Sequence, residues 1–252
     1  MNELERIEAL EREIRELKGL NIQKNIKTFS YSQITLKELR KLISLKKLFD
    51  NKPFDKWFSF SKEIGENDIV FLVDLLSKYG KLIKAYKEET LKANFIIPII
   101  NRVNFFSLEM ETSPFYEEVI TYENENFIFT GTTDFIVSKG LEYSEKPYFF
   151  IQEFKKGIKG SDPEPQLLAE LISAVELNNE TSMKGAYIIG AIWNFVILEK
   201  LGKDEYRYFV SDNFDSTKID DLKGIYRNLI FVKEEIIEMV RGENIRYNKI
   251  VK

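Results

Sequence analysis

The stretch "YFFIQEFKKG", Tyr148–Gly157, has the composition of a buried strand but carries charged residues in its second half. Aromatic and β-branched residues favour strands. The apolar residues here are Phe149, Phe150, Ile151 and Phe154. Successive side chains of a strand point to opposite faces, so Glu153 and Lys155 share one face. Because charges are rarely buried without a partner or a metal, this strand predicts a cleft with a function on that face.

The segments on either side of this strand predict a sheet and a covering helix. Residues 117–139 hold β-branched and aromatic residues around Asn124 to Asn126, which indicates a hairpin and places Asp134 on its second strand. Residues 163–179 predict a helix that carries Gln166 and Glu170 four apart, and so on one side. We expect Glu170 to lie on the solvated face of this helix or to pair with a lysine.

The remaining chain predicts further strands and several helices. Residues 184–202 indicate one or two strands whose Tyr187, Trp193 and Phe195 lie in the core, and residues 205–214 indicate another. Apolar residues at helical spacing predict helices over 35–49, 67–83 and 87–103, with Pro98 at a kink or boundary, and a last helix over 219–240.

The first residues predict an amphipathic helix with coiled-coil character. Its apolar residues are Leu4, Ile7, Leu10, Ile14 and Leu17. Such a helix either packs on its own domain or forms a homodimer with a twin helix. The expected organisation is an all-α region over residues 1–66, followed by an α/β domain over residues 67–252. In that domain helices flank a central mixed sheet.

Composition excludes several classes of protein. The chain has 252 residues, of which 44% are hydrophobic and 31% are charged, as in globular proteins. No apolar run approaches the ~20 residues that cross a bilayer, and the charged first residues lack the apolar core of a secretory signal. With no cysteine, disulfides and thiolate metal sites are excluded. We therefore expect a cytoplasmic protein that does not associate with membranes.

The absence of histidine narrows the chemistry further. It excludes histidine-based triads, an imidazole general base and the usual zinc ligand sets. Carboxylates, lysine, hydroxyls and hard cations such as Mg²⁺ or Mn²⁺ remain. The formal net charge of -4 argues against a uniformly basic surface that coats nucleic acid, but it leaves a local basic groove open.

Asp134 and Glu153, on neighbouring strands, are placed to hold one divalent cation between them. Mg²⁺ needs few protein ligands and keeps waters and substrate phosphate oxygens in its shell. A bound metal lowers the pKa of a coordinated water and neutralises charge that develops on phosphorus. Lys155 can orient or help to deprotonate that water and stabilise the transition state. The pattern indicates hydrolysis of a phosphate ester.

This arrangement resembles the PD-(D/E)XK nuclease superfamily, over roughly residues 88–209. The resemblance rests on Asp134, the triplet "EFK" that ends a hydrophobic strand at Lys155, and a following helix that opens on Gln166. It implies a restriction-endonuclease-like fold and products with 5′-phosphate and 3′-hydroxyl ends. It also implies that Asp134 and Glu153 bind the metal, that Lys155 serves the nucleophilic water, and that Gln166 supports the site or contacts DNA.

The resemblance extends to the helix before the sheet. The segment "EETLKANFIIPII" is similar to the helix that opens the nuclease domains of type I restriction subunits, and it implies that Glu88 or Glu89 completes the metal site. Thr133 precedes Asp134, a position that varies widely in the family. No tyrosine follows Gln166 at the RecB-like spacing, and the lack of cysteine excludes an iron–sulfur-bearing relative.

Each of these features can also be interpreted as an ordinary structural feature that has no function. Glu153 and Lys155 would be a surface ion pair if their strand lay at the edge of the sheet, and such pairs contribute only ~0–1 kcal/mol. Asp134 would be a strand-end residue, and Gln166 an ordinary residue of a first helical turn. Lys156 and Lys159, in the loop after the strand, either serve solubility or contact the phosphate backbone.

The sequence therefore predicts a Mg²⁺-dependent endo- or exonuclease that cleaves DNA, with RNA left open. The alternative is a catalytically inactive DNA-binding or protein-interaction module on the same fold. A small-molecule phosphohydrolase is disfavoured, because the chain lacks a phosphate-cradling glycine-rich loop such as GxxxxGK[ST].

Overall fold

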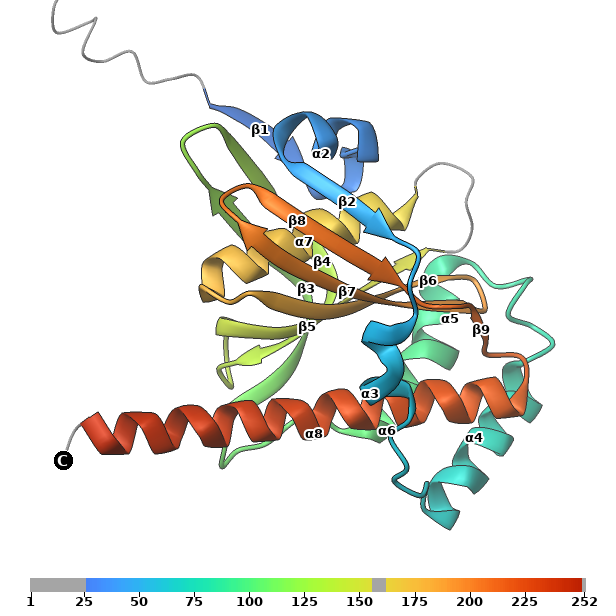
Figure 1. The fold of residues 1–252 in the computed structure, drawn as a ribbon. Coiled ribbons are helices and arrows are strands. Elements are labelled where there is room, and N and C mark those ends of the chain that lie inside the picture. Colours follow the sequence, from blue (N-terminus) through green and yellow to red (C-terminus); the bar gives the residue numbers. More distant parts are fainter. Residues whose placement is uncertain (1–25, 156–161, 251–252) are drawn as a thin grey trace, which may run out of the picture.

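The computed structural model describes residues 26–155 and 162–250, and it places them in one sheet with helices on both faces (Figure 1). The strands are β1 (Lys27–Ser30), β2 (Ser44–Leu48), β3 (Thr112–Glu123), β4 (Phe127–Lys139), β5 (Glu145–Lys155), β6 (Ser182–Ile189), β7 (Ile192–Gly202), β8 (Glu205–Val210) and β9 (Phe214–Asp215). The α-helices are α2 (Leu36–Leu42), α3 (Asp55–Phe58), α4 (Glu66–Tyr79), α5 (Glu88–Leu91), α6 (Ile97–Val103), α7 (Pro163–Asn178) and α8 (Ile219–Ile250). This confirms the predicted α/β class and the mixed sheet flanked by helices.

The sheet has the strand order β1-β4-β5-β6-β7-β8-β2, with β3 paired to β4 and β9 paired to β7. Its pairings are mixed, since β5 runs antiparallel to β4 but parallel to β6. The strand that carries Glu153 and Lys155 is therefore internal to the sheet. The interpretation of these two residues as an ion pair on an edge strand is wrong.

The predicted hairpin is confirmed as β3 and β4. The side-chain Oδ1 of Asn124 accepts hydrogen bonds from the backbone N–H groups of Asn126 and Phe127, both at 2.9 Å. Asparagine favours turns because its side chain can satisfy backbone groups two or three residues further on. The turn sets the register of β3 against β4, and the separate pairing of β4 with β5, in which Phe135 lies opposite Gln152, brings Asp134 beside the end of β5.

The two faces of the sheet bury different helices. One face packs on α7, with Ile136 and Ile151 in that core; the other packs on α8 and the short helices before the sheet, with Val137 and Phe150 in that core. Figure 1 shows α8 along one side of the sheet and α2 toward the opposite side. Helix α7 is enclosed, because the 3₁₀ helix η1 (Tyr31–Gln33) and α2 also pack against it. The expected core residues Tyr187, Trp193 and Phe195 are buried.

The expectation of an all-α region before residue 67 is wrong for residues 27–48. The predicted helix over 35–49 ends at Leu42, and β2 follows, paired in parallel with β8. Leu45 is buried while Lys46 is exposed, so the period of two typical of strands replaces the helical period here. Strand β1 pairs in parallel with β4. Pairing with distant strands overrides local helix propensity in this segment.

The helix expected over the first 20 residues, with its homodimer alternative, and the loop lysines Lys156 and Lys159 lie outside the described residues. Within the part of the chain that the structure covers, no helix is both long enough and apolar enough to cross a membrane.

Candidate active site

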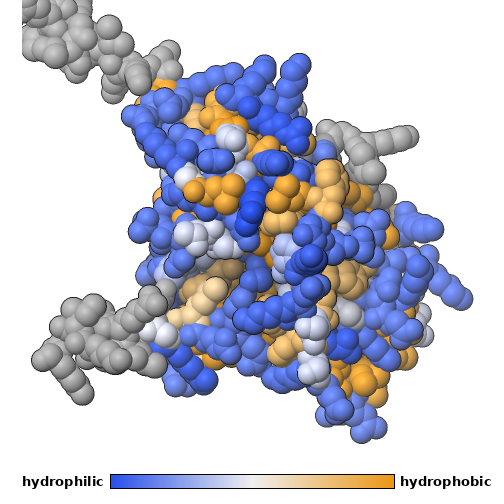
Figure 2. Space-filling model, viewed as in Figure 1, coloured by the Kyte–Doolittle hydropathy of each residue, from blue (hydrophilic) through white to orange (hydrophobic). Residues whose placement is uncertain are grey.

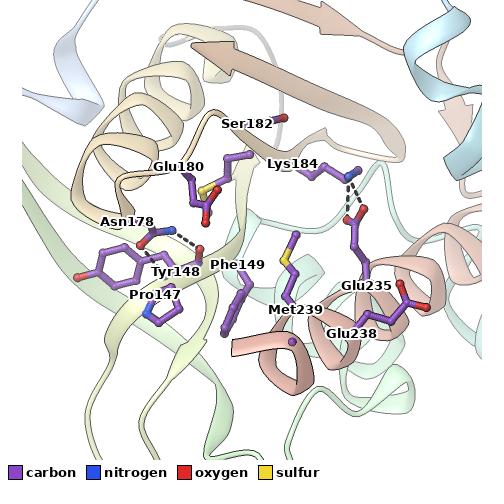
Figure 3. Close-up of a pocket in the computed structure, with 12 residues that line it drawn as sticks. Pro147, Tyr148, Phe149, Asn178, Glu180, Ser182, Lys184, Glu235, Glu238 and Met239 are labelled. Atoms are coloured by element: carbon purple, nitrogen blue, oxygen red, sulfur yellow. Dashed lines mark hydrogen bonds and ion pairs between the residues drawn. The ribbon is translucent and has the colours of Figure 1, made fainter. Parts of the chain in front are cut away.

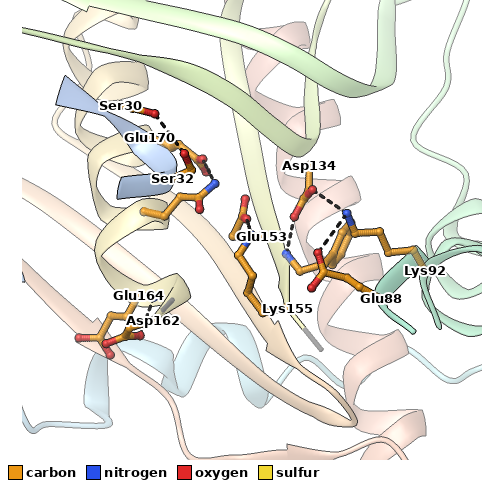
Figure 4. A network of polar contacts seen from close by, with 12 residues as sticks. Ser30, Ser32, Glu88, Lys92, Asp134, Glu153, Lys155, Asp162, Glu164 and Glu170 are labelled. Atoms are coloured by element: carbon orange, nitrogen blue, oxygen red, sulfur yellow. Dashed lines mark hydrogen bonds and ion pairs between the residues drawn. The ribbon is translucent and has the colours of Figure 1, made fainter. Parts of the chain in front are cut away.

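The predicted residues Asp134, Glu153 and Lys155 meet where the end of β5 lies beside the middle of β4, facing the first turns of α7 (Figure 4). Asp134 lies on β4, and Glu153 and Lys155 lie at the end of β5. All three point to the α7 side of the sheet, since their strand neighbours Ile136 and Ile151 belong to the core on that side. The sequence pattern of strand, strand and helix therefore converges on one location.

Asp134 is locked against the strand that carries Glu153. Its Oδ2 accepts a hydrogen bond of 2.7 Å from the backbone N–H of Phe154, and its Oδ1 accepts one of 2.8 Å from Lys92 Nζ. The backbone bond fixes the carboxylate beside β5, because a main-chain donor in a sheet cannot move independently. Asp134 and Glu153 are thus held as neighbours.

Glu153 is a buried carboxylate with incomplete hydrogen bonding. Its side chain is 1% exposed, and its Oε1 accepts a hydrogen bond of 2.7 Å from Lys155 Nζ. Its Oε2 is buried and finds no partner in the described part of the chain. Burial, and next the charge of Asp134, raise the pKa of Glu153 to about 8, although Lys155 opposes the shift. The site therefore favours an additional positive charge.

Lys155 is held in its cationic form. Burial disfavours its ammonium group, but the charges of Glu153 and Asp134 outweigh burial and raise its pKa. Its side chain is 19% exposed, so the ammonium group still reaches solvent at the mouth of the site. A lysine that stays protonated is unsuited to accept a proton from water. Its arrangement suits the stabilisation of negative charge on a substrate.

Lys92, which the sequence analysis did not single out, links the preceding helix to the site. This residue begins η3 (Lys92–Ile96), a π-helical turn between α5 and α6, and its side chain is buried. Its Nζ lies 2.8 Å from Asp134 Oδ1, 3.3 Å from Glu89 Oε1 and 3.8 Å from Glu88 Oε1. Burial lowers the pKa of Lys92, but Asp134 and Glu89 outweigh it and raise that pKa. The sequence could have predicted the burial of Lys92, because this residue lies four positions before Ile96 and so continues the apolar row of the helix.

Glu88 and Glu89 begin α5 as expected, and both reach Asp134 through Lys92. The Glu89 side chain is 82% exposed and points away from the buried carboxylates. The Glu88 side chain is 34% exposed, and its charge contributes to the raised pKa of Lys155. The structure therefore places Glu88 nearer to the site than Glu89.

Glu170 is fully buried, so the expectation that it lies on a solvated helix face is wrong. Its Oε1 accepts a hydrogen bond of 3.1 Å from Gln166 Nε2. Burial, and then the charge of Glu153, raise the pKa of Glu170 well above its usual range. Residues on all sides of α7 are apolar, which is the pattern of an enclosed helix and could have predicted this burial.

The unsatisfied atoms of this cluster are acceptors. Glu153 Oε2, Gln166 Oε1 and Glu170 Oε2 are buried without partners among residues 26–155 and 162–250. Excess carboxylate oxygens suit a hard cation that brings its own waters. Over the same residues, no group of three or more Asp, Glu, His or Cys side chains is arranged to hold an ion. The ligands that fit such an ion are the pair Asp134 and Glu153, with water completing the shell.

A second carboxylate network, absent from the sequence analysis, lies beside the site. Glu164 of α7 accepts hydrogen bonds from Lys47 Nζ at 2.8 and 3.0 Å, from Tyr208 Oη at 2.8 Å and from Tyr187 Oη at 3.3 Å. Tyr187 is the β6 residue that faces Glu153 in the sheet register. The donors come from β2, β6 and β8, so no local pattern could have revealed this network.

A pocket of about 490 Å³ lies elsewhere (Figure 3). It is lined by Tyr148, Phe149, Met183, Lys184, Glu235 and Met239 among others. Lys184 Nζ contacts both carboxylate oxygens of Glu235, at 2.7 and 2.8 Å. Tyr148 precedes Lys155 by seven residues, which corresponds to ~23 Å along an extended strand. The pocket is therefore separate from the acidic cluster.

No family model matches the chain, and a search of curated proteins finds no protein similar to it. The resemblance to the PD-(D/E)XK superfamily stays a prediction that rests on the residues and their geometry.

Proposed function

We propose that the protein is a Mg²⁺- or Mn²⁺-dependent nuclease that hydrolyses phosphodiester bonds in DNA, with a restriction-endonuclease-like core of the PD-(D/E)XK kind. The observation that carries this proposal is the buried Glu153 beside the partly buried Asp134, on neighbouring internal strands, with the ammonium group of Lys155 next to Glu153. A scaffold needs no such pair. Burying carboxylates without full compensation costs stability, and such costs concentrate at functional sites.

Each residue has a role that follows from its contacts. Asp134 and Glu153 would hold the cation, which when bound supplies a water of lowered pKa and neutralises charge on the phosphate. The Phe154 N–H keeps Asp134 in place. Lys155, held cationic by Glu153, stabilises the negative charge that grows on the phosphate during attack. Gln166 orients Glu170 behind the pair.

A cleavage assay on supercoiled plasmid DNA with Mg²⁺ tests the proposal. We expect the wild type to nick or degrade the plasmid, and Lys155→Ala and Asp134→Ala to lose at least ~100-fold in rate, the scale of removing one electrostatic contact to a transition state. Lys200→Ala is the matched control, since this strand lysine is also half-buried and paired, to Glu176 at 2.8 Å, away from the site. Full activity in both site variants contradicts the proposal. A parallel assay on RNA defines the substrate.

The alternative, a DNA-binding module without activity, has one observation in its favour. Lys92 already forms an ion pair with Asp134, and its ammonium group would have to move away from Asp134 Oδ1 before a metal could bind that oxygen. Tight DNA binding with no cleavage under any divalent cation would support this alternative. The homodimer through residues 4–17 and the cytoplasmic location stay predictions from the sequence.

A further inference from the structure

The segment from Lys37 to Lys47 is strongly basic in a chain whose net charge is -4. It contains five lysine or arginine residues and one acid, Glu38. The carboxylate of Glu38 is engaged locally, where its Oε2 accepts hydrogen bonds from the backbone N and the Oγ1 of Thr35 at 3.0 and 2.9 Å. Glu38 therefore stays ionised, and the segment keeps a net charge of +4 (five cations and one acid).

Three of these cations form one exposed face of α2. Lys37, Arg40 and Lys41 are spaced three and four residues apart, so they are neighbours on the helix surface, and all three are exposed. In the described part of the chain, no carboxylate forms an ion pair with any of them. Leu39, on the inner side, is fully buried. Hydrophilic residues dominate the surface near α2 at the upper end of the molecule (Figure 2).

A continuous row of polar side chains connects this face to the candidate active site. Tyr187 faces Glu153 in the sheet register and donates to Glu164. Glu164 in turn accepts hydrogen bonds from Tyr208 and Lys47.

The far end of the row reaches α2. Strand β2, which carries Lys47 opposite Tyr208, follows α2 and packs against it. Burial and the charge of Glu164 raise the pKa of Tyr208, and the charge of Arg40 opposes that shift. The row crosses the sheet from β5 through β6, β7 and β8 to β2, four steps in the strand order. Four steps of ~4.8 Å span about 19 Å.

We propose that the exposed face of α2, formed by Lys37, Arg40 and Lys41, binds the phosphate backbone of a DNA duplex whose scissile bond lies at Asp134 and Glu153. This inference rests on the proposed function and adds to it the surface that holds the substrate. Strands β5 and β2 are thus about half a helical turn of DNA apart, and α2 packs against β2, so one duplex is long enough to contact both places. Phosphate contacts of this kind position the substrate without reading its sequence.

An anionic membrane is the competing partner for a basic helix. Membrane-surface helices insert an exposed apolar face beside their cations. Here Leu39 packs into the core against α7, so the helix has no such face to offer. The charge pattern of α2 suits an anionic polymer better than a bilayer.

Salt-dependent binding to a 20-base-pair duplex in EDTA tests the inference on the full chain. The variant carries Lys37→Gln, Arg40→Gln and Lys41→Gln. Each lost phosphate contact reduces the slope of log K against log salt by ~0.9, so three contacts reduce it by about 2.7. Between 50 and 200 mM salt, the wild type should lose about 40-fold more affinity than the variant. In the cleavage assay the variant should raise KM and leave kcat near that of the wild type.

The matched control removes the same charge from the other side of the sheet. It carries Lys46→Gln, Lys56→Gln and Lys218→Gln, three exposed lysines, and should bind DNA like the wild type. If both triple variants lose affinity equally, or neither does, while the wild type cleaves DNA, the inference is overturned and the proposed nuclease stands. A wild type that neither binds nor cleaves DNA overturns both. Binding to vesicles of anionic lipid but not to DNA overturns the inference in favour of a membrane.

Discussion

Two glutamates, the buried Glu153 of β5 and the partly buried Glu164 of α7, lie between the sheet and α7, and their surroundings differ. Glu164 and Glu153 each pair with a strand lysine, Lys47 and Lys155, at 2.8 and 2.7 Å. Glu164 also accepts hydrogen bonds from two tyrosine hydroxyl groups, so both of its carboxylate oxygens have partners. Glu153 keeps one buried oxygen without a partner in the described residues and lies beside Asp134.

The difference separates a polar network with complete hydrogen bonding from one that lacks donors. Around Glu164 the charges and hydrogen bonds are complete, which makes a buried polar network rigid and specific. Around Glu153 acceptors exceed donors and carboxylates repel one another, so the site remains open to a cation. Burial alone does not distinguish the two clusters; the number of donors does.

The largest expected effect is on activity. Glu153→Gln removes a proposed metal ligand and should lower the Mg²⁺-dependent cleavage rate by about 10³-fold or more, since metal stabilisation of a transition state supplies several kcal/mol. Glu164→Gln changes the same atoms in the structural network and should keep the rate within about tenfold. Equal losses in the two variants, measured on plasmid DNA, would remove the distinction between the clusters.

The next effect is the stabilisation of the fold by metal. A ligand that binds only the folded state at 100 times its Kd raises the free energy of unfolding by about 2.7 kcal/mol. Urea titration with and without Mg²⁺ should show this gain in the wild type and in Glu164→Gln. The gain should be absent in Glu153→Gln. A gain of equal size in all three proteins would place the metal elsewhere.

Without metal, the two substitutions should differ in their effect on stability. Glu164→Gln leaves the half-buried Lys47 without a charged partner and should lower the free energy of unfolding by about 1–3 kcal/mol. Glu153→Gln replaces a carboxyl group that, with a pKa of about 8, is already largely neutral at pH 7, and it should change the free energy of unfolding by less than about 1 kcal/mol, or raise it. Urea denaturation in EDTA at pH 7 gives both values, and a larger cost at Glu153 would contradict the assignment.

The last effect is a pH dependence of stability without metal, which is small for each pH unit. The folded protein keeps a proton on Glu153 up to a pKa of about 8, whereas the unfolded chain loses it near the usual value of 4.5. The folded state thus binds more protons in this range, and stability should fall as pH rises from about 4.5 to about 8. For one proton the slope stays below ~1.4 kcal/mol per pH unit. Denaturation in EDTA across this range should show a shallower slope for Glu153→Gln, and an unchanged slope would assign the titration to another group.

Local patterns predicted the part of the fold that carries the site. The hairpin of β3 and β4, strand β5 and helices α7 and α8 follow from period, turn residues and apolar composition. Strand β2 could not be predicted, because "SLKKL" after a helix has no turn signal and becomes a strand only by pairing with β8. The Glu164 network could not be predicted from local patterns either, because its hydrogen-bond donors are distant from Glu164 in the sequence.

The site was predicted to the extent that strand alternation determines it. Alternation placed Glu153 and Lys155 on one face, and the strand order brought Asp134 to them. Lys92 was not considered, although it lies in an apolar row of its helix, and Glu170 was expected on a solvated face or paired with a lysine, although its helix is enclosed. A charged residue at an apolar position of a helix indicates a candidate site as strongly as a charged residue in an apolar strand does.

Anomalous diffraction from a crystal soaked in Mn²⁺ tests the central claim most directly, namely that Asp134 and Glu153 form a cation site. We expect one strong peak between these carboxylates, with Lys92 Nζ withdrawn from Asp134 Oδ1 and the Glu164 network unchanged. No peak at saturating Mn²⁺, or a peak beside Glu164 instead, would contradict the claim.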